Sequence, residues 1–270
     1  MLLRAVEYAG PDTVEEALQL LSQHPNARAL AGGQTLINVM KARAASPDVL
    51  VDLNGIEALK GISLKPDGSL EVGAMSTYTE VVESAEVAEA RPLLADVTAT
   101  IADVQVRNRG TVGGNVCAND PTNHLPPVCV AMGMRMTIAG EGGERTVPAE
   151  EFFLGVYMTA VSPGELLTKV TVPPAGDGGD GFASVTIGAD GTCIVNVAAT
   201  THDGEARLAV GCVSHVPVLL ETTADENMAS LAVRDAALDP PSDVHASADY
   251  RRHLAEVLAR RAMRQAKGAT

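Results

Sequence analysis

The sequence predicts an α+β fold built in two parts. Helical and strand-like stretches are mixed along the first two thirds of the chain, with apolar residues at helical spacing over 13–23 and short apolar runs over 27–31 and 49–53. Near the C-terminus, three apolar runs over 182–187, 193–200 and 206–212 are separated by Asp190-Gly191 and Asp203-Gly204, which are dipeptides typical of tight hairpins. Two helical stretches follow them. This order predicts an antiparallel sheet with helices on it rather than a repeated βαβ pattern.

The N-terminal stretch begins with a helix. Thr13 and Glu16 have the spacing of a capping box, in which the threonine side chain accepts from the backbone and the glutamate returns a bond. The apolar runs over 27–31 and 49–53 have the length of strands, and Gly32-Gly33 lies between them. Residues 1–55 are therefore expected to form a small βαβ-like unit.

The middle of the chain, residues 56–175, is expected to be a larger mixed α/β unit. Turn residues mark a hairpin, a Thr-Glu pair caps a short helix, and consecutive prolines are tolerated in the first turn of another helix. In chain order we expect a hairpin turn at 65–68, a helix capped by Thr77, a helix over 93–101, a helix from Leu125 to Gly133, and strands over 135–139 and 166–172.

A domain boundary is expected at the segment 173–181, which consists of proline, glycine, aspartate and one alanine. It divides the chain into residues 1–175 and 176–270. The second part holds the three predicted strands and two helices, over 225–238 and 248–265, with Gly268 as the stop of the last helix. We expect it to be a three-stranded antiparallel sheet with helices.

The composition excludes several classes of function. Lys and Arg number 20 against 34 Asp and Glu, and the net charge of −14 repels nucleic acids and anionic membranes. Aromatic residues make up 3% of the chain and Trp is absent, which argues against a base-stacking platform. No apolar run approaches the ~20 residues of a membrane helix, and the first residues do not resemble a signal peptide, so we expect a cytoplasmic protein.

The chain lacks the usual signatures of protein-based catalysis. The four cysteines (117, 129, 193 and 212) form no C-x-x-C pair, and the six histidines are scattered without an H-E-x-x-H motif. There is also no G-x-S-x-G motif. We therefore expect neither a catalytic side chain nor a bound metal ion in this chain.

Two glycine-rich stretches stand out, and we name them the first glycine turn (residues 30–36) and the second glycine turn (residues 106–121). The second contains Gly110, Gly113 and Gly114 beside Thr111 and Asn115, a pattern that fits either an ordinary turn or a backbone cradle for an anion. The first adds Gly32-Gly33 after a predicted strand. Neither is a G-x-G-x-x-G or P-loop motif. Two such turns favour a diphosphate ligand bound by main-chain N–H groups of both.

The residues of both glycine turns resemble motifs of a known family. Ala31-Gly32-Gly33-Gln34-Thr35-Leu36, followed by Met40-Lys41, Pro47, Val51-Asp52-Leu53 and Ile56, resembles the first flavin-binding motif of the FAD-binding (medium) subunits of molybdenum hydroxylases, the carbon monoxide dehydrogenase and xanthine dehydrogenase family. Residues 107–115, with Asp120-Pro121 and Leu125-Pro126-Pro127, resemble the second motif. Residues 243–254, continuing to Arg261-Ala262, are similar to the closing helix of the same subunits, so the resemblance covers nearly the whole chain.

The resemblance implies a fold and a set of binding residues. Residues 1–175 are expected to form a two-part FAD-binding domain of the vanillyl-alcohol-oxidase/PCMH type, and residues 176–270 a domain like the C-terminal one of carbon monoxide dehydrogenase flavoproteins. His124 stands where the family often has an acidic residue near the adenosine, and Asp120 is the other candidate for that contact. The residues implied to bind FAD are Ala29, Leu30, Ala31, Gly32, Gly33, Gln34, Thr35, Leu36, Ile101, Thr111, Gly114, Asn115, Ala118, Asp120, His124 and Leu167.

The resemblance also implies an electron-transfer role. The family assembles a large molybdenum–pterin subunit, a small subunit with two [2Fe-2S] clusters and this FAD subunit, often as a dimer of heterotrimers, with NAD, a quinone or another acceptor at the end of the chain. One departure is that residues 184–191 lack the basic residues common there, which bears on flavin tuning and on the acceptor. Two alternatives stay open: a self-sufficient flavin-dependent reductase or oxidase of the same superfamily, and a scaffold that has lost its flavin.

Overall fold

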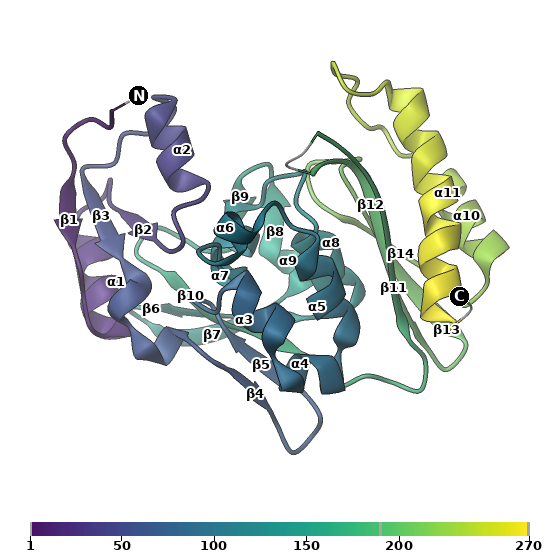
Figure 1. Ribbon diagram of the computed structural model, residues 1–270, viewed down its shortest axis with the longest axis horizontal. Coiled ribbons are helices and arrows are strands. Elements are labelled where there is room, and N and C mark those ends of the chain that lie inside the picture. Colours follow the sequence, from purple (N-terminus) through teal and green to yellow (C-terminus); the bar gives the residue numbers. More distant parts are fainter. Residues whose placement is uncertain (1, 189–190, 269–270) are drawn as a thin grey trace.

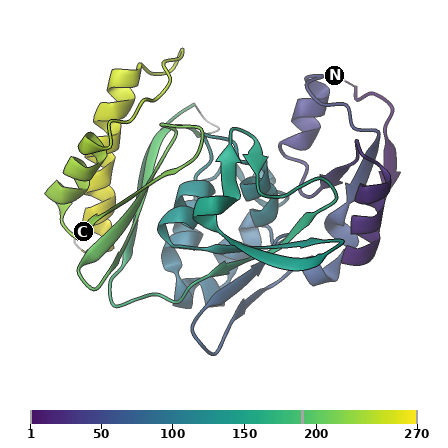
Figure 2. The same cartoon turned by 180° about the vertical axis from the view of Figure 1, so that it is seen from behind.

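The computed structural model describes residues 2–188 and 191–268. Figures 1 and 2 show three regions side by side: an N-terminal unit, a central unit of sheet and short helices, and a C-terminal sheet with the long last helix on its outer face. Separate clusters of buried apolar side chains lie in these regions, and the central cluster also takes in Ala198 and Ala209 of the C-terminal sheet. The C-terminal sheet therefore packs directly on the central unit.

The N-terminal unit is a three-stranded parallel sheet in the order β1-β3-β2. The expected helix and two strands are present, and β1 is an additional strand that was not predicted. In the capping box of the first helix, Thr13 accepts from the N–H of Glu16, but Glu16 accepts from the N–H of Asp12 instead of Thr13. The elements are β1 (Glu7–Ala9), α1 (Val14–Gln23), β2 (Arg28–Leu30), α2 (Leu36–Lys41), β3 (Val49–Asp52) and the 3-10 turns η1 (Leu53–Gly55) and η2 (Glu57–Leu59).

The central unit is a five-stranded antiparallel sheet in the order β4-β5-β10-β6-β7, with short helices and a small hairpin. The helix predicted from Thr77 is present with a complete capping box to Glu80, and the other helices and strands predicted for this region are also found. The elements are β4 (Ile62–Leu64), β5 (Leu70–Gly73), α3 (Tyr78–Glu83), α4 (Ala85–Ala90), α5 (Pro92–Ala99), α6 (Val104–Arg107), α7 (Val112–Ala118), α8 (Leu125–Ala131), β6 (Arg135–Gly140), β7 (Gly143–Pro148), α9 (Ala149–Phe152), β8 (Phe153–Gly155), β9 (Met158–Thr159) and β10 (Leu166–Val172).

The C-terminal sheet has four strands, where the sequence predicted three. The missed strand, β14, lies at the edge and is only partly buried, and its three apolar residues, 218–220, directly follow Pro217 and are too short a run to mark a strand on their own. The Asp203-Gly204 turn is a hairpin with positive φ at both residues, as predicted, whereas Asp190 of the other predicted turn lies outside the described residues. The elements are β11 (Asp180–Ile187), β12 (Thr192–His202), β13 (Glu205–Gly211), β14 (Val218–Thr223), α10 (Glu226–Asp235) and α11 (Ala248–Ala266).

The predicted linker is shorter than expected, because β11 already begins at Asp180. Asp180 accepts two hydrogen bonds from the guanidinium of Arg91, at 2.8 and 2.7 Å, and the same guanidinium donates to the carbonyl of Pro173 at 3.0 Å. Both charged side chains are almost completely buried. This ion pair joins the start of α5 to the first strand of the C-terminal sheet.

Candidate functional site

The two glycine turns lie in contact, although some 80 residues separate them in the sequence. A Cβ added at Gly32 would lie 2.6 Å from the carbonyl carbon of Arg109 and 2.9 Å from the Cα of Gly110, and nearer still to the oxygen of Arg109. A Cβ added at Gly114 would lie 3.6 Å from the Cβ of Ala31. Only glycine at position 32 permits this approach of the two backbones.

The first glycine turn presents a run of N–H groups for which the described residues offer no acceptor. Within the described parts of the chain, the N–H groups of residues 32–36 donate to no backbone or side-chain acceptor. Gly33 has φ +72°, a left-handed conformation that turns the chain sharply at this point. The side chain of Asn54 stabilises the turn by donating a hydrogen bond to the carbonyl of Ala31 at 3.2 Å. Consecutive free N–H groups of this kind form a concave site for an anion.

The second glycine turn uses its N–H groups differently from what was expected. Gly113 donates to the carbonyl of Ala74 at 2.8 Å, Gly114 to the hydroxyl of Thr111 at 3.0 Å, and Val112 to the carbonyl of Ser76 at 3.0 Å. Thr111 is thus the N-cap of α7, and the glycines lie inside the first turn of that helix. These three N–H groups are used within the protein, so among the described residues the long run of N–H groups without an acceptor lies in the first glycine turn.

A cleft of about 1270 Å³ runs along both turns. Of the residues implied to bind FAD, all but Leu30 and Asp120 line it. Residues that were not predicted from the sequence also line it, and they come mainly from α1, α2, the residues just after β5, the first residue of α3, the β8–β9 hairpin, the segment 161–166 and the start of β12. They include Ala74, Met75, Tyr78, Tyr157, Met158, Gly191 and Thr192.

Asp120 and His124 have structural partners. The Asp120 carboxylate accepts from the N–H and hydroxyl of Thr122, and from the hydroxyl of Tyr157 at 3.1 Å. His124 is buried, and its Nδ1 lies 3.2 Å from the side-chain nitrogen of Asn196 on β12. Burial lowers the pKa of His124 to about 4, so the ring is neutral at physiological pH. With Nδ1 accepting from Asn196, the Nε2–H remains as a donor.

Asn115 carries an unpaired acceptor at the cleft. The residue is 7% exposed, its side-chain amide nitrogen donates to the hydroxyl of Tyr78 at 2.9 Å, and its Oδ1 has no hydrogen-bond partner among the described residues. A buried acceptor without a partner is unfavourable by about 1–3 kcal/mol, so such an atom in a cleft indicates a place for a ligand donor.

The cleft offers little side-chain charge. The charged side chains among its described lining residues are Arg28 and Glu165, and Glu165 is paired with Arg145 at 2.7 Å. The hydrogen bonds from Arg145 hold the pKa of Glu165 below its usual range, so this carboxylate is ionised. A diphosphate in this cleft would be balanced mainly by N–H dipoles of the first glycine turn.

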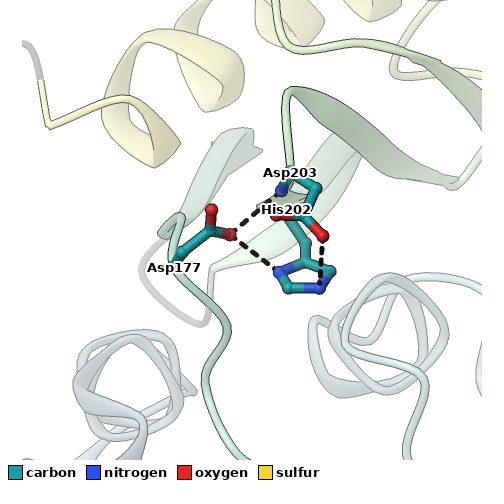
Figure 3. Close-up of side chains that lie close together, drawn as sticks. All are labelled: Asp177, His202 and Asp203. Atoms are coloured by element: carbon teal, nitrogen blue, oxygen red, sulfur yellow. Dashed lines mark hydrogen bonds and ion pairs between the residues drawn. The ribbon is translucent and has the colours of Figure 1, made fainter.

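The structure also brings together three possible metal ligands that the sequence did not point to. Asp177, His202 and Asp203 place one ligand atom each within 4.8 Å of the others (Figure 3). All three side chains are exposed, and they bond to one another: His202 Nδ1 lies 2.8 Å from Asp177, and the N–H of Asp203 donates to Asp177 at 3.0 Å. These contacts fasten the 173–179 segment to the β12–β13 hairpin, and they account for the cluster without a metal ion.

The fit of FAD to this cleft rests on three observations. The run of free N–H groups matches a diphosphate, the unpaired Oδ1 of Asn115 matches a hydroxyl or N–H donor, and the volume exceeds the roughly 300–1,000 Å³ of ordinary small-ligand pockets, as an extended dinucleotide requires. These features are those of a dinucleotide-binding site in a mixed α/β fold, and the described lining residues include no acid–base pair.

Comparison with known proteins gives the class and then the family. Residues 4–175 match the model of the FAD binding domain in molybdopterin dehydrogenase. The chain is 34% identical to the carbon monoxide dehydrogenase medium chain of Afipia carboxidovorans, covering 99% of this chain and 98% of that one, and 34% identical to the nicotine 6-hydroxylase medium subunit of Paenarthrobacter nicotinovorans over the full length of both. The chain belongs to the FAD-binding medium subunits of molybdenum hydroxylases.

Solved structures of related enzymes have chains with the same fold as this one. Quinoline 2-oxidoreductase from Pseudomonas putida 86 contains a chain that matches with a TM-score of 0.91 at 33% identity, covering 100% of this chain and 99% of that one. Reconstituted CO dehydrogenase from Oligotropha carboxidovorans contains one that matches with a TM-score of 0.93 at 32% identity over 100% of both. The protein is thus an oxidoreductase subunit that binds FAD. None of the helices in the described ranges is long and apolar enough to cross a membrane.

Several cleft residues escaped the sequence analysis for a common reason. Tyr78 follows a helix cap, Tyr157 and Met158 belong to a short hairpin, and Thr192 begins a strand, so each has a local role that explains its type. Only the fold brings them to the glycine turns. Tyr157 and Met158 of the hairpin are about 60% exposed, which is unusual for large apolar side chains, but this exposure is visible only in the structure.

Proposed function

We propose that this chain is the electron-transfer subunit of a molybdenum hydroxylase. In this role the bound FAD accepts electrons from [2Fe-2S] clusters of a small partner subunit and passes them to an external acceptor such as NAD or a quinone. We further propose a large partner subunit with molybdenum–pterin, assembly as a dimer of heterotrimers, and a division of this chain into an FAD-binding domain (1–175, with parts 1–55 and 56–175) and a C-terminal domain (176–270).

The run of free N–H groups over residues 32–36 is the observation that carries the proposal. These groups lie in a turn whose position is fixed by backbone contact with Arg109 and Gly110, and they line the cleft. Preorganised dipoles bind an anion without reorganising the protein. In this proposal they hold the FAD diphosphate, and the sugar and ring portions extend along the rest of the cleft.

The other cleft residues would orient the cofactor rather than react. Asn115 offers an acceptor, the Nε2–H of neutral His124 a donor, and Leu167 and Ile101 apolar surface. Gly191 and Thr192 bring the start of β12 to the same cleft, next to the segment 184–191 that lacks the usual basic residues. When bound, FAD supplies the redox chemistry itself, so the protein needs to contribute position and electrostatics alone.

The partner assignment follows the relatives' names. The proteins matched over nearly their whole length are medium chains or subunits of multi-subunit dehydrogenases and hydroxylases. A self-sufficient reductase or oxidase would need a proton donor or base beside the flavin. The titratable side chains in the described lining are an ion-paired glutamate, a buried neutral histidine, two tyrosines, a half-buried cysteine and Arg28, which favours the subunit role.

The test compares the chain alone with its complex. The purified chain should bind FAD with a flavin absorbance spectrum, and substrates of the complex should reduce that flavin only when the molybdenum and iron–sulfur subunits are present. Rapid-mixing absorbance at the flavin band measures both. If the isolated chain turned over an organic substrate with its flavin, the electron-transfer role would be refuted and the self-sufficient enzyme supported. Failure to take up FAD would refute the site itself.

A further inference from the structure

We infer that Tyr78 is a cofactor-binding residue: its hydroxyl orients the Asn115 side chain, and Tyr78 O–H and Asn115 Oδ1 together bind one sugar hydroxyl of FAD. This inference rests on the proposed FAD site and adds a residue and a ligand group to it. The two side chains come from α3 and α7, which the fold brings together across the second glycine turn.

Three contacts with the second glycine turn hold Tyr78 in place. Its backbone N–H donates to the carbonyl of Gly110 at 3.0 Å, and the adjacent residue Thr77 pairs with Thr111 in an antiparallel bridge. A Cβ at Gly110 would lie 2.6 Å from Cε2 of the Tyr78 ring, so the ring packs directly against the glycine backbone. The side chain is 5% exposed. The phenol therefore has one position relative to the second glycine turn.

Asn115 is oriented by that phenol. Its side-chain nitrogen donates to the Tyr78 hydroxyl at 2.9 Å, which leaves Oδ1 buried and without a partner in the described structure. The Tyr78 hydroxyl accepts this bond, and its own proton has no acceptor within the described ranges. Burial raises the pKa of Tyr78 to about 12, so the proton stays in place at any pH at which the protein functions. Both residues line the cleft.

The pair is complementary to a hydroxyl group. A hydroxyl accepts one hydrogen bond and donates another, so it satisfies the Tyr78 proton and the Asn115 oxygen together. Asn115 directly follows Gly114, which lies beside Ala31 where the two glycine turns meet. The N–H groups without an acceptor in the described structure begin at Gly32, the residue after Ala31. The groups covalently next to a diphosphate in FAD are the ribityl chain on one side and the ribose on the other, and both carry hydroxyls.

The experiment measures FAD affinity of the full-length apo chain by quenching of flavin fluorescence. Tyr78→Phe removes only the hydroxyl and should raise the Kd about 5- to 20-fold, the effect of one buried hydrogen-bonding group. Asn115→Leu should raise it at least as much, and the double variant should match Asn115→Leu within about twofold because the two residues act together. Tyr250→Phe, which removes an exposed hydroxyl on α11, is the control and should leave the Kd unchanged.

Titration with FMN and with ADP identifies the hydroxyl. FMN carries the ribityl chain and ADP the ribose, so weaker binding of FMN alone by Tyr78→Phe assigns the pair to the ribityl side, and weaker binding of ADP alone to the ribose side. If the variant lowers the thermal midpoint of the apo chain but leaves all three affinities unchanged, Tyr78 is structural and the inference is overturned. Should Tyr78→Phe fail to fold, Asn115→Leu gives the same test. Wild-type chain that binds no FAD would instead refute the proposed site.

Discussion

Replacing Gly32 by alanine tests whether the contact between the two glycine turns sets FAD affinity. The new methyl would lie 2.6 Å from the carbonyl carbon of Arg109 and 2.9 Å from the Cα of Gly110. Carbon atoms in contact prefer about 3.5–4.0 Å, so the two backbones must separate by about 1 Å. Because both obstacles are main-chain atoms, no side-chain rotation relieves the overlap.

The separation acts on stability and on binding. Overpacking of this kind lowers the free energy of unfolding by about 1–3 kcal/mol. That corresponds to a drop of roughly 2–12 °C in Tm for a chain of this size. The displaced N–H groups no longer point jointly at the diphosphate, and we expect the Kd for FAD to rise by at least about tenfold, or about 1.4 kcal/mol.

The assay pairs thermal unfolding of the apo chain with FAD titration. Gly142→Ala is the matched control, because a Cβ there meets nothing within 4 Å and its φ is not positive. Surface changes of that kind alter stability by no more than about 0.5 kcal/mol. A Gly32→Ala chain with wild-type Tm and a Kd within twofold of wild type would show that the two turns do not depend on this contact, and the account of the site would be wrong.

Three further predictions concern the rest of the chain. Arg91→Met leaves the buried Asp180 carboxylate unpaired and should lower the free energy of unfolding, measured in urea, by about 3–5 kcal/mol. The control Arg234→Met breaks the more exposed pair with Glu256 and should lower it by less than about 1 kcal/mol. FAD affinity should fall less than about threefold between 50 and 500 mM NaCl, because uncharged N–H dipoles, and not exposed lysines and arginines, would hold the diphosphate. A steep salt dependence in the titration would contradict this. The pKa of His124 is about 4 in the folded chain and 6.5 in the unfolded chain. As the pH falls, the unfolded state therefore takes up the proton first. The chain should therefore lose about 3 kcal/mol between pH 7 and 4, a loss that His124→Asn should not share in parallel urea titrations.

Local sequence signals predicted most of the elements, since those elements are determined locally. The cap at Thr77 and Glu80, the Asp203-Gly204 hairpin and the stop at Gly268 each depend on neighbours within a few residues, and each is found in the structure. The strand β14 was missed because its burial is partial and depends on its position at the sheet edge. The start of β11 at Asp180 was missed because its glycine-rich sequence resembles a linker, while a buried ion pair with Arg91 holds it in the strand.

The candidate site was predicted in outline and not in detail. The two glycine motifs identified the cleft, and the contact between Gly32 and the second turn agrees with the expectation that they converge. What the pattern did not reveal is how each N–H group is used, since that depends on whether an acceptor such as the Ala74 carbonyl lies nearby in the folded chain. The partner of Asn115 was equally hidden, because Tyr78 is 37 residues away in the sequence.

Glycine therefore serves two different purposes in the two turns. In the first, glycine gives a positive φ at Gly33 and close backbone approach at Gly32, and the N–H groups remain free. In the second, a Cβ at Gly113 would lie 2.6 Å from the Cβ and carbonyl oxygen of Ala74, so glycine allows α7 to dock on the end of β5. The second turn thereby fixes the position of the first through the backbone contact at Gly32. In the proposed site the same residue type therefore has two roles: it leaves the first turn open to the FAD diphosphate, and it lets the second turn pack closely enough to hold the first in that shape.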